Sequence, residues 1–393
     1  MKFLDLFAGI GGFRLGMESA GHECIGFCEV DKFARASYKA IHDTKGEIEL
    51  HDITRVTDES IRRIGSVDVI CGGFPCQAFS IAGNRRGFED TRGTLFFEIA
   101  RFASILRPKY LFLENVKGLL NHENGITFET IISTLDELGY DVEWQVLNSK
   151  NFGVPQNRER VFIIGHLRGE RTRRVFPLSS ASKQVDKHQK LSTNTLTTRY
   201  PNSQGVGSYI IESESQRVSS IGNINPSGRG MNGEVYQADG LAPTLTTNKG
   251  EGVKIIQRAH EYNQGGEHDI APTLTRNSYH ENNVLKITEA TSQGYTEATI
   301  GDSVNLSHPN SQTRRGRVGK QIANTLLTGE SQGVVEPDFR IRKLTPRECW
   351  RLQGFPDWAF DKAQEVNSNF QLYKQAGNGV TVNVIAAIAK ELE

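Results

Sequence analysis

The chain opens with the stretch Lys2-Phe3-Leu4-Asp5-Leu6-Phe7-Ala8-Gly9-Ile10-Gly11-Gly12. Its apolar start predicts a strand over 2–7, and the glycines predict a tight turn into a helix over 13–20, which Gly21 ends. Glycines in such a turn let a ligand approach the backbone closely. This opening therefore predicts the first strand, turn and helix of an α/β sheet, with a ligand site at the turn.

An acid stands at the end of the second predicted strand, which covers 22–28. Glu29 follows the glycine turn by about 20 residues, where a carboxylate can accept hydrogen bonds from ribose hydroxyls. The glycines do not form G-x-G-x-x-G, and basic residues that would meet a pyrophosphate are sparse. A sugar-adenosine ligand without phosphate therefore fits better than NAD, and a dinucleotide oxidoreductase is the alternative.

Short apolar runs and helical patterns alternate through the first part of the chain. Strands are predicted over 67–71, 110–113, 142–147 and 161–164, and helices over 31–41, 94–106 and 128–138. Such alternation is typical of crossover connections around a parallel sheet. The predicted fold class is a doubly wound, Rossmann-like α/β sheet.

A cysteine follows one of these strands directly. Cys76 lies in Gly72-Gly73-Phe74-Pro75-Cys76-Gln77-Ala78-Phe79-Ser80, so its thiol is expected at the carboxyl edge of the sheet, where doubly wound folds bind ligands. The two glycines and the rigid Phe-Pro lead-in favour an exposed, reactive thiol. The other cysteines are interpreted as small buried apolar residues, namely Cys24, Cys28, Cys71 and Cys349.

Two further polar groups are expected near that edge. Glu114 and Asn115 end the strand over 110–113, and burial in a dry pocket would raise the pKa of Glu114 so that it could donate a proton. Arg158 and Arg160 alternate on the approach to the next strand, and their planar guanidiniums suit a base carbonyl or a phosphate. The alternatives are a helix cap for Glu114 and structural ion pairs for the arginines.

The character of the chain changes near residue 168. From there to about 340 it is rich in Ser, Thr, Asn, Gln and Gly, which predicts a β-rich domain inserted into the α/β domain. We expect residues 1–167 and 341–393 to form the α/β domain together and residues 168–340 to form the inserted one. A Thr-Leu element recurs in the insertion, either as repeated edge strands or as DNA contacts, at Thr195-Leu196, Thr244-Leu245, Thr273-Leu274 and Thr325-Leu326.

The helical pattern returns after the insertion. Thr345, Pro346 and Glu348 combine an N-cap, a proline at the first helical position and a capping-box acid, which predicts a helix start. Asn378 and Gly379 then precede an apolar helix over 380–389.

Composition sets broad limits on the protein's class. Lys plus Arg equals Asp plus Glu, 46 each, which argues mildly against a nucleic-acid binder, but basic runs over 168–190 and 314–320 allow local phosphate-binding surfaces or solvated basic faces. The five cysteines form no C-x-x-C pair, so neither a disulfide framework nor a metal site is predicted. No basic leader or membrane-length apolar stretch is present, so we expect a cytoplasmic protein with no membrane association.

Taken in order, these motifs closely resemble the DNA (cytosine-5) methyltransferase family. The resemblance spans both flanks of the insertion and includes Asp5–Gly12, Glu29-Val30-Asp31, Asp52-Ile53, Pro75-Cys76-Gln77, Arg92–Phe96, Glu114-Asn115-Val116, Gln156–Arg160 and Gln375–Val380. It implies an S-adenosylmethionine-dependent methyltransferase sheet with a target-recognition domain over 168–340. The residues that it implies for the cofactor site are Phe7, Gly9, Ile10, Gly11, Glu29, Val30, Asp52, Ile53, Pro75, Leu95, Asn378 and Gly379, the last standing where the family usually has serine.

The resemblance also implies a mechanism on double-stranded DNA. A cytosine is flipped out of the duplex, and the Cys76 thiolate adds to its C6 so that C5 becomes nucleophilic. Glu114 acts at N3, Asn115 steadies the pocket, and Arg158 faces the base carbonyl with Arg160 in support. The implied DNA contacts are Gln77, Ser80, Arg92, Thr325 and Leu326.

Several alternatives remain at this point. An RNA cytosine methyltransferase would share the chemistry, although the long insertion counts against it, and a catalytically silent DNA-binding relative would not have kept the full motif set. We expect a monomer that belongs to a restriction-modification system, a phage or another mobile element. The sequence does not indicate which bases are recognised.

Overall fold

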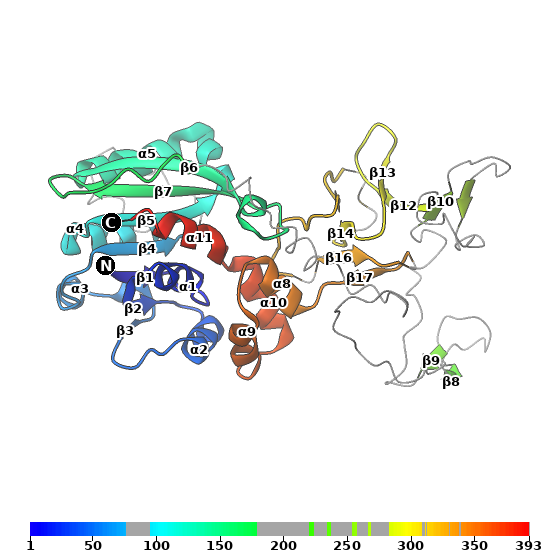
Figure 1. The fold of residues 1–393 in the computed structure, drawn as a ribbon, viewed down its shortest axis with the longest axis horizontal. Coiled ribbons are helices and arrows are strands. Elements are labelled where there is room, and N and C mark those ends of the chain that lie inside the picture. The colour runs from blue at the N-terminus through cyan, green and yellow to red at the C-terminus, as the bar shows by residue number, and fades with distance from the viewer. Residues whose placement is uncertain are drawn as a thin grey trace, which may run out of the picture.

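The protein's structure is a computed structural model. It describes residues 1–75, 95–178, 220–223, 234–236, 254–257, 266–268, 283–308, 311, 313–329, 331–337 and 339–392. Figure 1 shows a sheet covered by helices, a group of C-terminal helices beside it, and a set of small sheets beyond them. None of the described helices is long and apolar enough to cross a lipid bilayer.

The main sheet has seven strands, and its centre is parallel (Figure 1). In spatial order the strands are β3 (Ile48–Leu50), β2 (Glu23–Cys28), β1 (Lys2–Leu6), β4 (Val69–Gly73), β5 (Tyr110–Val116), β7 (Glu159–Leu167) and β6 (Tyr140–Asn148). Strands β3, β2, β1, β4 and β5 pair in parallel. Their carboxyl ends therefore meet at one edge, as the sequence predicts.

The parallel prediction is wrong for the last two strands. β7 pairs antiparallel with both β5 and β6. The link between β6 and β7 contains only a 3₁₀ turn (Ser149–Phe152) and no crossover helix. Antiparallel pairing follows, because parallel neighbours need a long crossover connection.

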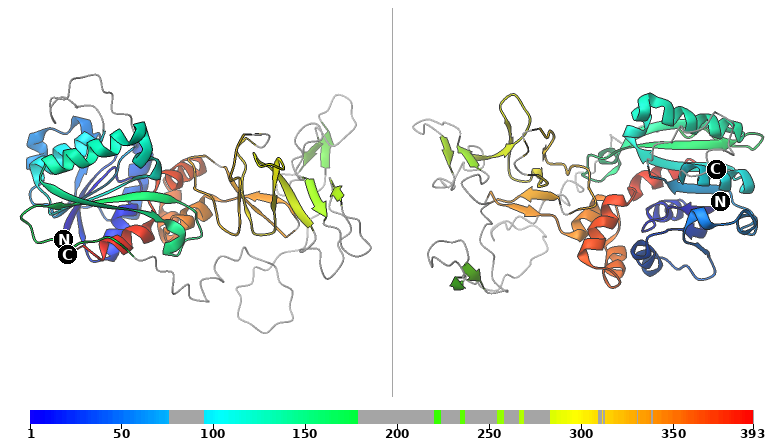
Figure 2. Two further views of the ribbon diagram at one scale, coloured as in Figure 1. Left: turned by 90° about the horizontal axis from the view of Figure 1, so that it is seen from above. Right: turned by 180° about the vertical axis from the view of Figure 1, so that it is seen from behind.

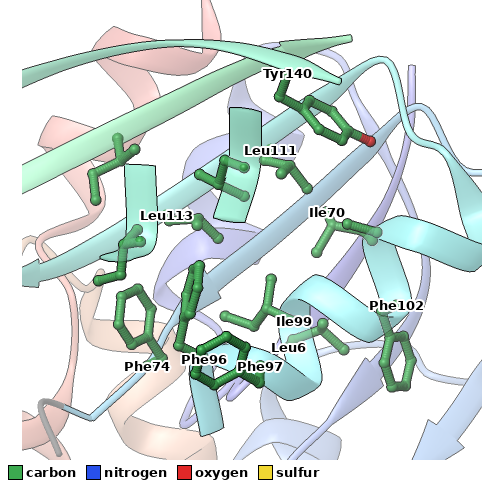
Figure 3. Close-up of a cluster of buried hydrophobic side chains, with 14 of the residues drawn as sticks. Leu6, Ile70, Phe74, Phe96, Phe97, Ile99, Phe102, Leu111, Leu113 and Tyr140 are labelled. Atoms are coloured by element: carbon green, nitrogen blue, oxygen red, sulfur yellow. The ribbon is translucent and has the colours of Figure 1, made fainter. Parts of the chain in front are cut away.

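Helices cover both faces of the sheet, and Figure 2 shows red α11 on the side opposite cyan α5. The helices of this part are α1 (Gly12–Ser19), α2 (Lys32–Ile41), α3 (Asp58–Arg62), α4 (Leu95–Leu106), α5 (Ile126–Glu137) and α11 (Val382–Ala389). Alternation along the strands supplies both cores. Leu6, Ile70 and Leu111 face α4 and α5, as Figure 3 shows for the α4 side, whereas Phe3 and Phe112 face α1 and α11.

The C-terminal segment completes the α/β unit. It forms α8 (Pro346–Leu352), α9 (Asp357–Gln364), α10 (Asn369–Asn378) and α11. The predicted capping box is present: the Thr345 hydroxyl accepts from Glu348 N–H, and the Glu348 carboxylate accepts from Thr345 N–H. α11 packs so tightly on α1 that a Cβ at Gly16 would lie 2.5 Å from Ile385.

The described parts of the insertion form small antiparallel sheets, as the sequence predicts. One contains β10 (Lys254–Gln257), β11 (Gly266–His268), β12 (Asn283–Thr288) and β13 (Tyr295–Ala298), and another contains β14 (Ser303–Asn305), β15 (Val318–Gly319), β16 (Gln332–Val335) and β17 (Ile341–Lys343). β17 pairs with β16 although it lies just past the predicted boundary at residue 340. A two-stranded sheet pairs β8 (Ser220–Asn223) with β9 (Glu234–Tyr236). Leu285, Val304 and Val335 belong to a core that joins the two larger sheets.

Candidate active site

A cavity of about 590 Å³ opens at the carboxyl edge of the parallel strands. Residues from the turn after β1, from the ends of β2, β4 and β5, from the start of β7 and from the end of α10 line it. Of the residues predicted for the site, those on its wall are Phe7, Gly9, Ile10, Glu29, Val30, Asp52, Ile53, Pro75, Leu95, Glu114, Asn115, Arg158, Arg160, Asn378 and Gly379. Four more predicted residues lie outside the described part of the chain: Cys76, Gln77, Ser80 and Arg92.

The glycine turn presents its backbone to this cavity. Gly9 has φ +57°, and a Cβ placed on it would meet nothing within 4 Å, so the space beside it is open. Gly11 has φ +84°, and a Cβ there would lie 2.1 Å from His42 Nε2. Gly9 therefore leaves room for a ligand, whereas Gly11 is needed because His42 packs against the turn.

Glu29 is fixed beside the turn by two backbone groups. Gly9 N–H donates to its Oε2 at 2.8 Å, and Asp31 N–H donates to its Oε1 at 2.7 Å. Burial raises the pKa of Glu29, and these two N–H donors oppose the rise. Each carboxylate oxygen keeps a second lone pair, so the pre-positioned group can still accept from ribose hydroxyls.

The rest of this end of the cavity suits an adenosine without phosphate. Apolar walls come from Ile53, Phe74 and Leu95. Asp52 Oδ1 accepts from Thr54 N–H at 3.1 Å and from Thr54 Oγ1 at 2.7 Å, and these hydrogen bonds lower its pKa, so Asp52 is an ionised acceptor. Lys374 also lines the wall but is paired with Asp31 at 2.7 Å. This lining fits S-adenosylmethionine, since it offers acceptors and an apolar slot, and the described cations on the wall are paired within the protein.

The other end of the cavity holds an acid between strand ends. Gly73 of β4 stands opposite Glu114 of β5 in the parallel register, and a Cβ at Gly73 would lie 3.3 Å from Glu114 Oε2. Glu114 is 7% exposed and pairs with Arg160 Nε at 3.0 Å. Burial raises the pKa of the Glu114 carboxyl, and the positive charges of Arg160 and Arg158 limit the rise.

Asn115 ties the ends of the two strands together. Its Nδ2 donates to the Phe74 carbonyl oxygen at 2.9 Å, and the Asn115 side chain is buried. Pro75 follows Phe74 on the cavity wall. The backbone that leads into Cys76 is thus held beside the Glu114 carboxyl.

The two arginines have different surroundings. Arg160 pairs with Glu114, whereas the Arg158 guanidinium donates to the carbonyl oxygens of Gly379 at 2.9 Å and Gly377 at 3.4 Å. The family resemblance implies that Arg158 faces the base carbonyl, with Arg160 in support. The contacts favour the opposite division, in which Arg160 stands by the acid and Arg158 holds the C-terminal end of α10.

Comparison with known proteins decides the family. The family model of the C-5 cytosine-specific DNA methylases matches residues 1–393. The chain belongs to this family. It is a DNA cytosine-5 methyltransferase, and the methyl donor of the family is S-adenosylmethionine.

Two relatives match this methyltransferase over almost all of its length. It is 36% identical over 433 residues to the orphan methyltransferase M.SPRI of Bacillus phage SPR, with 100% of this chain and 97% of the relative covered. It is 35% identical to the type II methyltransferase M.HpaII of Haemophilus parainfluenzae, with 99% and 88% covered. A solved DNA modification methyltransferase encoded within an E. coli prophage shares the fold, with a TM-score of 0.52 at 19% identity and 100% and 98% coverage.

The structure places the Thr325-Leu326 pair of this methyltransferase against its catalytic part. Thr325 Oγ1 donates to the Asn157 carbonyl oxygen at 2.7 Å. Leu326 is 4% exposed and belongs to an apolar cluster with Trp350 and Ala376. This pair therefore attaches the insertion to the catalytic part, whatever else it contacts. The copies at 195–196, 244–245 and 273–274 lie outside the described residues.

The basic run over 314–320 is partly structural. Arg317 is 5% exposed and donates to the carbonyl oxygens of Thr288 at 2.7 Å and Asn305 at 3.0 Å. Lys320 pairs with the buried Asp302 at 2.9 Å. These two cations stabilise the insertion itself, so the run is not a uniform phosphate-binding surface.

No site role was predicted for three cavity residues on α10, Lys374, Gln375 and Gly377, although the last two stand in a motif that carries the family resemblance. The buried Gln375 amide accepts from Ser37 Oγ at 3.0 Å and donates to the Phe33 carbonyl oxygen at 3.1 Å, which attaches α10 to α2. Their position within four residues before Asn378 was the available signal, because a helix that ends at a site also presents its last turn to it.

A substitution of Glu29 tests the cofactor end of the cavity. Glu29→Ala is expected to weaken S-adenosylhomocysteine binding by about tenfold or more, because it removes a charge-assisted acceptor and frees two backbone donors that hold the turn. Isothermal titration calorimetry measures the change. Glu23→Ala is a suitable control, because Glu23 stands at the opposite end of β2 from Glu29 and does not line the cavity. Wild-type affinity in Glu29→Ala would contradict the assignment.

A buried acid behind the turn gives a pH-dependent stability. Asp5 is 0% exposed, and burial raises its pKa well above the ordinary value against the opposing charge of Arg14. A raised folded-state pKa makes the free energy of unfolding fall as pH rises from the ordinary carboxyl range through the raised value. Asp5→Asn is expected to reduce this fall, measured as the urea midpoint across that range. An unchanged pH dependence would contradict the expectation.

Proposed function

We propose that Cys76 and Glu114 carry the chemistry of methyl transfer in this protein. Support comes from the Gly73–Glu114 register and the hydrogen bond from Asn115 to Phe74, which hold the ends of β4 and β5 together at the cavity. Cys76 follows Pro75 in the chain, so their Cα atoms are about 3.8 Å apart. This arrangement is the observation on which the proposal rests.

The reaction begins with a cytosine extruded into the cavity, since its ring cannot be reached within the stack. The Cys76 thiolate adds to C6, while Glu114 provides a proton or hydrogen bond to N3 as negative charge develops on the ring. C5 then takes up the methyl group, its proton is removed, and the C6–S bond breaks to expel the thiolate. S-adenosylmethionine supplies an electrophilic methyl group on its sulfonium sulfur.

Arg160 contributes to base binding in this proposal. Its pairing with Glu114 at 3.0 Å places a guanidinium donor beside the acid, where it can reach the base carbonyl. Arg158 acts on the C-terminal turn instead, through the Gly377 and Gly379 carbonyls. Asn115 positions the backbone ahead of Cys76.

For the cofactor, we assign Glu29 to the ribose hydroxyls and Asp52 to the adenine amino group. Both residues line the cavity, together with Val30 and Ile53, which supports this assignment. Phe7, Gly9, Ile10, Pro75, Leu95, Asn378 and Gly379 form the remaining wall. Gly11 serves indirectly by fitting the turn against His42.

On the DNA side, we assign target recognition to residues 168–340. The insertion's separate small sheets and its own core support this division, although residues 175 and 176 pack in the core of the main sheet. In this proposal, DNA around the flipped cytosine is contacted by Gln77, Ser80 and Arg92. Thr325 and Leu326 lie where the insertion meets the catalytic part. We expect a monomer in the cytoplasm, in a phage or restriction-modification setting like those named for its relatives.

Bisulfite sequencing of DNA from cells that express the chain tests the activity and finds its target. We expect protected cytosines in a short sequence context and none in cells that express Cys76→Ser. Absence of protected cytosines with well-expressed wild-type protein would contradict the proposed site. Protected cytosines in RNA alone would favour an RNA substrate.

A further inference from the structure

The last two residues of α10 and its C-cap, residues 377–379, line the cavity, and we name them the 377–379 turn. This turn is held from two sides. One side is a stretch of the insertion, residues 323–328, which we name the docking segment. It lies in the chain between β15 and β16, and Figure 1 shows α8 and α10 between those small sheets and the main sheet. The other side is Arg158 at the approach to β7.

Backbone hydrogen bonds attach the docking segment to the approach to β7. Asn157 N–H donates to the Ala323 carbonyl oxygen at 2.8 Å, and Ala323 N–H donates to the Pro155 carbonyl oxygen at 2.9 Å. Thr325 Oγ1 adds the bond to the Asn157 carbonyl oxygen. The segment is therefore fixed next to Arg158 in space, although more than 160 residues separate them in the chain.

The docking segment also touches α10 and the turn itself. Leu326 is buried in the apolar cluster of Trp350, Cys349 and Ala376. A Cβ at Gly377 would lie 2.5 Å from the carbonyl carbon and oxygen of Leu327, so only glycine fits there without displacement. A shift of the docking segment would therefore displace the 377–379 turn.

Arg158 holds the same turn through a buried side chain. It is 3% exposed, and its guanidinium bonds the Gly377 and Gly379 carbonyls on both sides of Asn378. A planar fork can bridge two carbonyls, which a lysine ammonium on a flexible stem does less well. The described hydrogen bonds of this guanidinium are therefore made to the 377–379 turn.

We propose that Arg158 and Leu326 are positioning residues that clamp the 377–379 turn, so that the seating of the recognition insertion controls the affinity of the cofactor pocket. The inference rests on the assignment of Asn378 and Gly379 to that pocket. Because coupling is reciprocal, cofactor binding strengthens the seating of the insertion to the same degree. Recognition of DNA and binding of the methyl donor are then linked through the protein, without direct contact between them.

Calorimetric titration with S-adenosylhomocysteine, without DNA, tests this link. Leu326→Ala is expected to weaken binding about five- to twentyfold, within the usual range of coupling between sites, although Leu326 does not line the cavity. Leu285→Ala is the matched control: it makes the same change in the core of the insertion, where Leu285 is 1% exposed and distant in the chain from the docking segment. We expect wild-type affinity in that control. Equal weakening in both variants, or none in Leu326→Ala, overturns the proposal.

Two further substitutions test the same proposal independently of any folding defect in Leu326→Ala. Gly377→Ala inserts one methyl group at the 2.5 Å contact, and Arg158→Lys keeps the charge without the fork. Each is expected to weaken S-adenosylhomocysteine binding, and combining Arg158→Lys with Leu326→Ala should weaken it by less than the product of the single effects, because both act on one turn. If the effects of the two substitutions on affinity multiply instead, the proposal that both residues hold this turn is overturned. Wild-type protein that fails to bind S-adenosylhomocysteine would instead contradict the pocket assignment in the proposed function.

Discussion

Replacement of Cys76 by serine is expected to reduce methyl transfer to DNA by more than about 10³-fold, the scale of loss when a catalytic nucleophile is removed. A serine hydroxyl is a far weaker acid than a thiol and offers almost no anion to add to C6 at neutral pH. Incorporation of labelled methyl groups from S-adenosylmethionine into plasmid DNA measures the change. Binding of S-adenosylhomocysteine is expected to stay at the wild-type level.

Cys71 supplies the control for this variant. It stands five positions earlier in the same stretch of chain, is 0% exposed within β4, and does not line the cavity. Cys71→Ala is therefore expected to keep methyl transfer. Cys76→Ser protein with activity within about tenfold of wild type would remove Cys76 as the nucleophile, since such losses are normally much larger.

Replacement of Glu114 by glutamine is expected to lower methyl transfer by about 10²- to 10⁴-fold, the usual range for a general acid. Glutamine fits the same space between Gly73 and Arg160 but cannot provide a proton to N3. Because burial raises the pKa of Glu114, the acid form persists to higher pH than for an ordinary carboxyl, and activity should decline as pH rises through that value. This decline in kcat/KM should be absent from the residual activity of Glu114→Gln.

Glu143 offers a comparable carboxylate elsewhere on the sheet. It lies on β6, pairs with His166 at 3.0 Å and does not line the cavity. Glu143→Gln is expected to transfer methyl groups like the wild type. A Glu114→Gln variant as active as Glu143→Gln would exclude a proton-donating role for Glu114.

Much of the fold follows from local patterns in the sequence. The strands around 2–7, 22–28 and 110–113 and the capping box at Thr345 were predictable, because apolar runs, glycine stops and cap residues act over a few positions. β3 is only three residues long, too short for a periodic signal. The antiparallel pairing of β7 depends on which strand lies next to it, although the lack of a helical pattern between β6 and β7 indicated it.

The candidate site, like the fold, was predictable from the sequence only in part. Glu29, Glu114 and the Gly9 turn were predictable because they follow strands whose carboxyl ends share an edge. The partner of Arg158 was not, because the Gly377 and Gly379 carbonyls lie more than 200 residues further along the chain. The burial of Leu326 against Trp350 likewise depends on how the insertion returns to the catalytic part.

In the proposed mechanism, a thiol and a carboxyl at neighbouring strand ends act on one base beside the methyl donor. A duplex that contains 5-fluorocytosine tests it most directly, since fluorine at C5 cannot leave as the proton does and the base stays bonded to the nucleophile after methyl transfer. With S-adenosylmethionine present, we predict a protein–DNA complex that survives denaturation, with mass spectrometry locating the nucleotide on the Cys76 sulfur. An enzyme that methylates ordinary DNA yet forms no such complex, or forms it through another residue, would contradict the account.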